Sequence, residues 1–188
     1  CDPYMDGMLN QPPSADHPFG TDNKGRDVLS RMMVGARTSL VIGLGATAFA
    51  LVVGSIIGSI AAVSRKWISE VIMRIMDIIM SFPGIALAAT LIIVFGQNLP
   101  TLVLAIGFLY IPQIARIVRA NVVSEYGHDY VRAVVVSGAR APWILIKHVM
   151  RNCAAPVMVF TIVLVADAIV FEASLSFLNA GIPEPAAT

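Results

Sequence analysis

The chain has 188 residues, of which 57% are hydrophobic and only 13% are charged, and its formal net charge is +1. Soluble domains carry about 25% charged residues, so this composition excludes an ordinary soluble protein, and the balanced charge gives no sign of a nucleic-acid-binding surface. No charged residue lies between Arg37 and Arg65 or between Asp77 and Arg116, and residues 152–166 are also free of charge. Each gap is close to the ~20 apolar residues that a spanning helix needs, which indicates an integral membrane protein.

The N-terminal stretch HPFGTDNKGRDVLSR (residues 17–31) has the glycine spacing of a phosphate-binding P-loop, with Gly20 and Gly25 four residues apart. The chemistry excludes that function, because Arg26 replaces the lysine and Asp27, whose carboxylate repels phosphate, replaces the hydroxyl residue. We expect residues 1–25 to be a polar loop and residues 26–37 a short amphipathic helix on the membrane surface, with Asp27 in its first turn. The predicted division is therefore an external region over 1–37 and a transmembrane domain over 38–188.

Four membrane spans are predicted, over residues 38–63, 78–95, 101–119 and 153–173. Pro83, Pro112 and Pro156 are expected to interrupt or kink three of them. The predicted loop from Arg65 to Asp77 and the segment from Arg116 to Arg151 are rich in basic residues, whereas the turn at 96–100 has none. The positive-inside rule therefore places both basic segments in the cytoplasm. The alternation of the spans then places the N-terminal region outside, although it carries four bases, Lys24, Arg26, Arg31 and Arg37.

Small residues recur at every fourth position of the first span, a spacing that lets another helix backbone approach closely. The stripe consists of Ala46, Ala50, Gly54, Gly58 and Ala62. It predicts a tight helix–helix seam within a bundle, although glycine and alanine are common in membrane helices in any case.

The cytoplasmic segment over residues 124–152 predicts a short helix of about eight residues, with Asp129 as its N-cap and Ser137 as its last residue. Gly138 suits the left-handed position that ends a helix, and Pro142 can open the next one. About eight residues are too few for a stable isolated helix in water, which favours docking onto a partner. The alternative is an ordinary loop resting on the membrane surface.

Several stretches, in the same order, resemble one family. DYVRAVVVSGA resembles the loop signature EYVEAARALGA of permease subunits of bacterial binding-protein-dependent ATP-binding cassette importers, and the match continues in IPQIARIVRANVVSE and IKHVMRN. HPFGTDNKGRDVLSRMMVGARTSL and EASLSFLNAGI resemble the dipeptide, oligopeptide and nickel branch of that family. The chain departs from the family pattern at Arg132, Val134, Arg151 and Asn179.

The resemblance implies an all-α inner-membrane permease with a coupling helix that sits in a cleft of a cytosolic ATPase subunit. Carried over by position, the coupling residues are Tyr130, Arg132, Ala133, Gly138 and Ala139. The implied partners are a second permease, two cytosolic ATPase subunits, an external substrate-binding protein and the bilayer. The chain itself would not be an enzyme, and it would move peptides by alternating access; nickel chelates, glutathione-like or other small solutes are alternatives. Because the family has six spans, we expect the chain to be a fragment that lacks one span at each end.

Asp167 and Glu172 lie within the last predicted span, where ionisable groups are costly and usually face a cavity or a partner. Asp167 is a candidate for the translocation path, where it could meet a peptide amino terminus or a metal ion. A polar pairing with the second permease is the alternative, and Glu172 has no role that its position defines.

His17, His128 and His148 stand apart, and Cys1 and Cys153 have neither disulfide nor metal spacing, so we expect no metal site and no cofactor. A channel or a membrane-embedded enzyme would need a ring of charges, paired aspartates or an HExxH motif, and the sequence has none.

Overall fold

The computed structural model describes residues 10–15, 17–138, 141–178 and 181, and in these segments all side chains except those of residues 132, 135, 141 and 142. Every named element is helical, which confirms the predicted all-α class. In chain order they are α1 (Val28–Val63), α2 (Lys66–Met80), α3 (Gly84–Phe95), α4 (Leu99–Tyr126), α5 (Asp129–Val136), α6 (Ala141–Ile144), the π-helical turn η1 (Leu145–Val149) and α7 (Met150–Phe177).

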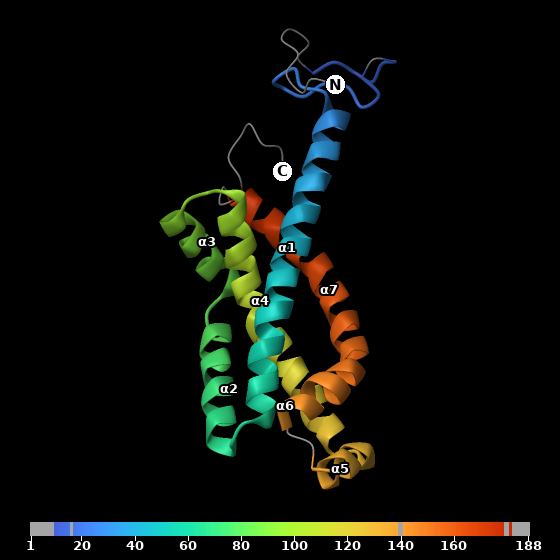
Figure 1. Ribbon diagram of the computed structural model, residues 1–188. Coiled ribbons are helices and arrows are strands. Elements are labelled where there is room, and N and C mark those ends of the chain that lie inside the picture. The colour runs from blue at the N-terminus through green and yellow to red at the C-terminus, as the bar shows by residue number, and fades with distance from the viewer. Residues whose placement is uncertain (1–9, 16, 139–140, 179–180, 182–188) are drawn as a thin grey trace.

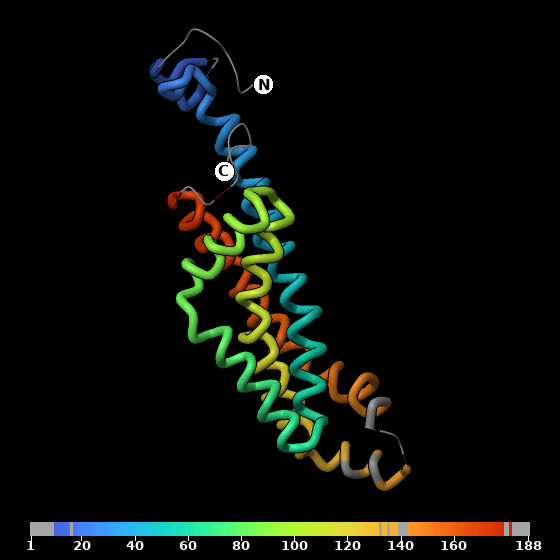
Figure 2. Tube along the Cα trace, turned by 90° about the vertical axis from the view of Figure 1, so that its left-hand side faces the viewer, coloured from blue at the N-terminus to red at the C-terminus, as the bar shows by residue number. Residues whose placement is uncertain are grey.

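The helices form an elongated bundle in which α1, α4 and α7 are the long members (Figure 1). The N-terminal loop lies at one end of the bundle, and α5 lies at the opposite end, as both views show (Figure 2). Three helical stretches are long and apolar enough to cross a membrane, namely Val28–Val63, Leu99–Tyr126 and Leu145–Phe177. A polytopic helical bundle is therefore confirmed.

The second predicted span is corrected by the structure. Residues 66–77, expected to be a loop, belong to helix α2, and the chain then bends by 84° between α2 and α3. The break falls at Ser81, Phe82 and Pro83, because proline has no backbone N–H to continue the helix and disfavours helical backbone in the residue before it. With 12 residues, α3 is about 18 Å long, too short to cross a ~30 Å hydrocarbon core alone. The fourth span therefore exists only if the bent pair α2–α3 counts as one.

The helix expected over residues 26–37 forms one continuous helix with the first span. Helix α1 runs without interruption from Val28 to Val63, across the predicted boundary at residue 37. Asp27 lies one position before this helix, as its N-cap, and its carboxylate accepts a hydrogen bond from the Ser30 N–H at 2.9 Å. The predicted interfacial location of this segment stays a prediction.

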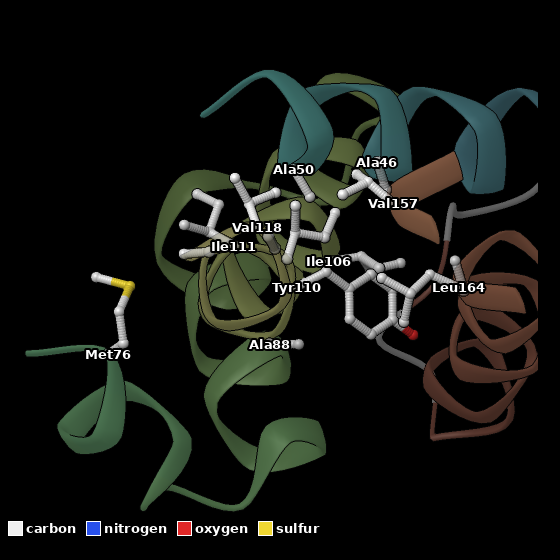
Figure 3. Packing of buried hydrophobic residues seen from close by; sticks show 14 of the residues in the cluster. Ala46, Ala50, Met76, Ala88, Ile106, Tyr110, Ile111, Val118, Val157 and Leu164 are labelled. Atoms are coloured by element: carbon white, nitrogen blue, oxygen red, sulfur yellow. The ribbon is translucent and has the colours of Figure 1, made fainter. Parts of the chain in front are cut away.

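The small residues of α1 lie against α4. Ala46 and Ala50 are fully buried among apolar side chains of α4 (Figure 3), Gly54 and Gly58 are also buried, and Ala62 is half-buried. A Cβ atom on Gly58 would lie only 2.5 Å from the Ala115 carbonyl oxygen, and one on Gly54 would lie 2.9 Å from Ile114. Helix α4 also has a glycine at the contact: a Cβ on Gly107 would lie 2.8 Å from the Ala46 carbonyl oxygen. The two backbones approach closely because one helix or the other has a glycine at each of these three contacts.

The end of the bundle that holds α5 and the α1–α2 turn is the basic end, and we refer to it as the cytoplasmic end, as the positive-inside rule assigns it. Arg65 lies in the α1–α2 turn, Lys66 begins α2, and Arg119 lies in the last part of α4. The turn at residues 96–98, which has no basic residue, lies at the opposite end (Figure 1). An ion pair connects α2 to α4, because Arg116 of α4 donates to the Asp77 carboxylate of α2 at 2.7 Å.

Candidate functional site

A short helix stands at the cytoplasmic end between two long ones. Helix α5 has eight residues, Asp129–Val136, with the acidic Asp129 in its first turn. Gly138 follows in the left-handed region at φ +82°, and no atom of the part of the chain that the structure describes lies within 4 Å of the position that its Cβ would take. The glycine is thus needed for the turn and not for space. Helix α6 then begins at Ala141, so Pro142 is its second residue.

Polar side chains tie α5 to the ends of α4 and α7. The Tyr130 hydroxyl donates to the Glu125 carboxylate of α4, and the Asn152 amide of α7 donates to the Tyr130 hydroxyl at 3.0 Å. Partial burial, together with the hydrogen bond to Glu125, raises the pKa of Tyr130, so its hydroxyl stays a proton donor at neutral pH. Three helices therefore meet in one hydrogen-bonded group that holds the start of α5 in place.

Helix α5 has a packed face and an open face. Val131 is 1% exposed and Val134 packs against the core, whereas Ala133 is exposed and Val136 is 88% exposed. Ala133 and Val136 are three residues apart, so they share one side of the helix. That open side carries small or short apolar groups that a partner surface can approach closely. Of the remaining predicted coupling positions, Ala139 and the side chain of Arg132 lie outside what the structure describes.

The chain between α5 and α7 passes through the π-helical turn η1 (Leu145–Val149). A π turn holds one more residue than an α turn and often marks a functional position. Trp143 lies just before it, with the Lys147 ammonium 4.7 Å from its ring centre and the His148 ring at 5.0 Å. The connection from α5 into α7 is therefore helical throughout α6 and η1.

Asp167 lies on the exposed surface of α7, near the middle of this helix. The Tyr110 hydroxyl of α4 donates to its Oδ2 atom at 2.8 Å, and Tyr110 itself is 3% exposed. Figure 3 shows the Tyr110 ring reaching from α4 toward Leu164 of α7. Asp167 is ten residues before the end of α7, and Tyr110 is eleven after the start of α4, so both lie about 15–17 Å from the outer helix ends. An exposed carboxylate at that depth requires a polar surrounding.

Glu172 has a different environment. Its side chain is 1% exposed, and its Oε2 atom accepts a hydrogen bond from the Ser39 hydroxyl of α1 at 3.0 Å. Its Oε1 atom is buried and has no hydrogen-bond partner among the described residues. Glu172 therefore connects α7 to α1 inside the bundle, and in this conformation it faces no open path.

The loop that resembled a P-loop wraps around its own carboxylate. Asp22 accepts hydrogen bonds from the backbone N–H groups of Lys24 and Arg26 and from the side chains of Arg26 and Arg31. Although burial opposes the charged form, these hydrogen bonds outweigh it and hold the pKa of Asp22 well below its usual range. Gly20 and Gly25 provide the left-handed turns, at φ +71° and +75°. The anion that this loop surrounds is thus its own Asp22 carboxylate.

Sequence reasoning missed the partners of these residues. Tyr110 lies outside the stretches that resemble the family. Glu125, Asn152 and Ser39 lie inside them, but the resemblance does not say which side chain each one contacts. The repeat of Gly107, Ile111 and Ala115 at four-residue spacing was a usable signal for the α4 side of the seam. His17, His128 and His148 have separate protein partners, in Asp27, Ser124 and Trp143. Cys153 is a buried free thiol, and Cys1 lies outside the described residues.

Comparisons with known proteins fit this arrangement. Residues 50–186 match the family described as the binding-protein-dependent transport system inner membrane component. The chain is 38% identical over 183 residues to the oligopeptide transport system permease protein of Bacillus subtilis, an alignment that covers 96% of this chain and 60% of that protein. It is 37% identical over 175 residues to the dipeptide transport system permease protein of Alkalihalophilus pseudofirmus, with 93% and 58% covered. It is 33% identical over 183 residues to the glutathione transport system permease protein of Pectobacterium atrosepticum, with 97% and 61% covered.

The chain thus spans about 60% of the length of the relatives that it matches. The family match extends from the middle of α1 through α7 and so includes every helix of the cytoplasmic end. The chain belongs to the family of inner membrane components of binding-protein-dependent transport systems.

Proposed function

We propose that the chain is a permease subunit of an ATP-driven importer, which moves di- or oligopeptides inward by alternating access. Its partners are a second permease, two cytosolic ATPase subunits and an external substrate-binding protein. Supporting this, the chain belongs to a transport family and is similar to proteins named as oligopeptide, dipeptide and glutathione permeases. Nickel chelates and other small solutes are the alternative substrates within the same class, and ATP hydrolysis is assigned to the partner subunits.

The observation that carries the proposal is the open face of α5 at the cytoplasmic end. An eight-residue helix with Ala133 and Val136 facing outward offers a small apolar contact surface to a soluble domain. The Tyr130–Glu125–Asn152 group transmits a displacement of α5 to α4 and α7. Tyr130, Arg132, Ala133, Gly138 and Ala139 are the proposed coupling residues. Closure of the ATPases on ATP then shifts α5, and the long helices rock with it.

Asp167 is the proposed polar group of the translocation path. Its exposure at mid-membrane depth and its orientation by Tyr110 suit an encounter with the ammonium group of a peptide or with another cation. A contact with a polar residue of the second permease is the competing role. Replacement with asparagine separates the two, because a path residue changes uptake with assembly intact, whereas an interface residue changes assembly.

The ordered loop around Asp22 lies at the external end, where a substrate-binding protein docks in the proposed topology (Figure 1). Phe19 is 57% exposed on that loop and is available for such a contact. A purely structural role in beginning α1 is the alternative for this region. The channel and membrane-enzyme alternatives have no supporting feature in the described residues, and co-purification with an ATPase distinguishes them from the transporter.

The test of the coupling role is a Gly138→Val substitution in the reconstituted transporter. A β-branched residue at φ +82° is strained, so the turn after α5 must rearrange. Gly96→Val is the matched control, because Gly96 is also at positive φ, +94°, but lies in the turn at the external end. We expect Gly138→Val to separate ATP hydrolysis from uptake or to release the ATPases, and Gly96→Val to leave both coupled. Unchanged assembly, hydrolysis and uptake in Gly138→Val would rule out the docking assignment.

A further inference from the structure

A cavity opens beside α2 at the cytoplasmic end, outside the regions used in the proposed function. Its volume is about 600 Å³, and it lies between α2 and α4, with Trp67, Val71, Arg74 and Arg119 among its lining residues. Two acids, Glu70 and Asp77, also line it. Asp77 is neutralised by its ion pair with Arg116 at 2.7 Å. The cavity thus offers guanidinium groups at the depth where lipid headgroups meet the cytoplasm.

The two arginines of the cavity retain donors for a ligand. Arg119 uses its Nε atom to hold Ser69 at 2.9 Å, which fixes the side chain and leaves its terminal nitrogens available. Arg74 is exposed and makes no hydrogen bond or ion pair with any residue that the structure describes. A guanidinium binds a phosphate through two parallel hydrogen bonds, which makes a phosphodiester the matching anion. Basic residues outnumber acids in α2, its preceding turn and the facing part of α4: Arg65, Lys66, Arg74, Arg116 and Arg119 against Glu70 and Asp77.

An exposed apolar row begins at the same cavity and leads toward the middle of the membrane. Trp67, Val71, Ile75 and Ile78 recur at helical spacing on one side of α2, and each is between 49% and 64% exposed. At 1.5 Å per residue the row is about 16 Å long. Trp67, at its cytoplasmic end, is the residue type that favours the headgroup level. A basic cavity followed by an apolar row is complementary to a phospholipid, because the cavity matches an anionic headgroup and the row matches the acyl chains.

We propose that the α2–α4 cavity binds an anionic phospholipid of the cytoplasmic leaflet, with its phosphate on Arg74 and Arg119 and its acyl chains along the α2 row. Basic cavities between membrane helices on the cytoplasmic side suit such headgroups. A helix of the second permease suits the row less well, because close helix seams use small residues, as α1 does, whereas this row consists of tryptophan, valine and isoleucine. The inference does not depend on the transported substrate.

The experiment is native mass spectrometry of the assembled transporter, delipidated in detergent and titrated with phosphatidylglycerol or phosphatidylcholine. We expect a bound phosphatidylglycerol that phosphatidylcholine does not replace at equal concentration. Arg74→Gln should weaken it about fivefold and Arg74→Gln with Arg119→Gln about 25-fold, since one base near an anionic headgroup contributes roughly a factor of five. Arg151→Gln is the charge-matched control, because Arg151 is also an exposed cytoplasmic base but lies on α7, away from the cavity; it should stay within twofold.

Two further variants keep the result interpretable. Ser69→Ala removes the hydrogen bond between Ser69 and Arg119 but keeps both arginine charges. If the arginines act by binding the headgroup and not by stabilising the local fold, this variant should retain the lipid. Arg74→Lys keeps the charge but loses the paired hydrogen bonds of the guanidinium, so it should weaken binding by less than Arg74→Gln does. Equal phosphatidylglycerol binding in the wild type and in the double variant overturns the proposal. Loss of the second permease from Arg74→Gln complexes also overturns it, because the cavity would then be a subunit seam.

Discussion

Gly58→Ala is the most direct test of how α1 packs on α4. The added Cβ would lie 2.5 Å from the Ala115 carbonyl oxygen and 2.9 Å from the Val118 Cβ, and both neighbours belong to the opposing helix. Optimal contacts need ~3.5 Å, so the helices must separate by roughly 1 Å here, and each neighbouring contact loses a quarter to a half of its dispersion energy. Overpacking of this kind costs about 1–3 kcal/mol. Alanine's better helix propensity offsets up to ~1 kcal/mol.

The expected net loss is therefore about 1–2 kcal/mol, which corresponds to an apparent Tm lower by about 2–8 °C. The assay heats the purified transporter in steps and measures the fraction that stays monodisperse on gel filtration. Gly45→Ala is the matched control on the same helix, because its Cβ would meet no backbone atom of another helix, only the methyl groups of Val103, at 3.2 and 3.4 Å. A Gly58→Ala transporter as stable as the Gly45→Ala transporter would refute the close approach of the two backbones.

Three further predictions concern the polar groups. Tyr130→Phe removes the hydroxyl that joins Glu125 to Asn152, so amide hydrogen exchange in α5 should become faster by the equivalent of about 1–2 kcal/mol, while α1 is unchanged. Glu172→Gln keeps an oxygen for the Ser39 hydroxyl and should assemble normally, whereas Glu172→Ala leaves a buried hole and should lower the apparent Tm; equal stability of the two variants would contradict the buried position. Because the folded-state pKa of Asp22 is lowered, its stabilisation is present above the unfolded-state value near 3.8 and is lost only as pH falls toward the folded-state pKa, so exchange protection of the external loop should be the same at pH 7 and pH 5 and should decrease in Asp22→Asn.

The local features of this fold are visible in the sequence because they depend on one or two residues. Asp129 and Gly138 stand at the two ends of α5, and the helix, Asp129–Val136, is shifted by one residue from the predicted one, which had Asp129 as its N-cap and ended at Ser137. Helix α2 was missed because Lys66, Glu70, Arg74 and Asp77 made residues 66–77 look like a polar loop, although these charges recur at helical spacing. Amphipathic helices at a membrane surface carry that pattern, and the apolar positions between the charges were the overlooked signal.

The contacts between distant segments are not encoded in any local pattern. Tyr110 and Asp167 are 57 positions apart, and Ser39 and Glu172 are 133 apart. Which oxygen meets which hydroxyl depends on how α1, α4 and α7 cross, and that depends on the packing of the whole bundle. The glycine stripe on α1 predicted a seam but could not name α4 as its partner, because a stripe specifies only a face.

The central claim is that the open face of α5 contacts a cytosolic ATPase subunit. The measurement that tests it most directly places a photo-reactive benzoylphenylalanine at Ala133 in the assembled transporter and illuminates membranes that contain all subunits. The same residue at Gln97, in the external turn, is the control. We predict a covalent adduct with the ATPase from position 133 and none from position 97. Absence of an ATPase adduct at position 133, in a transporter that still hydrolyses ATP and imports its substrate, would contradict the coupling role of α5.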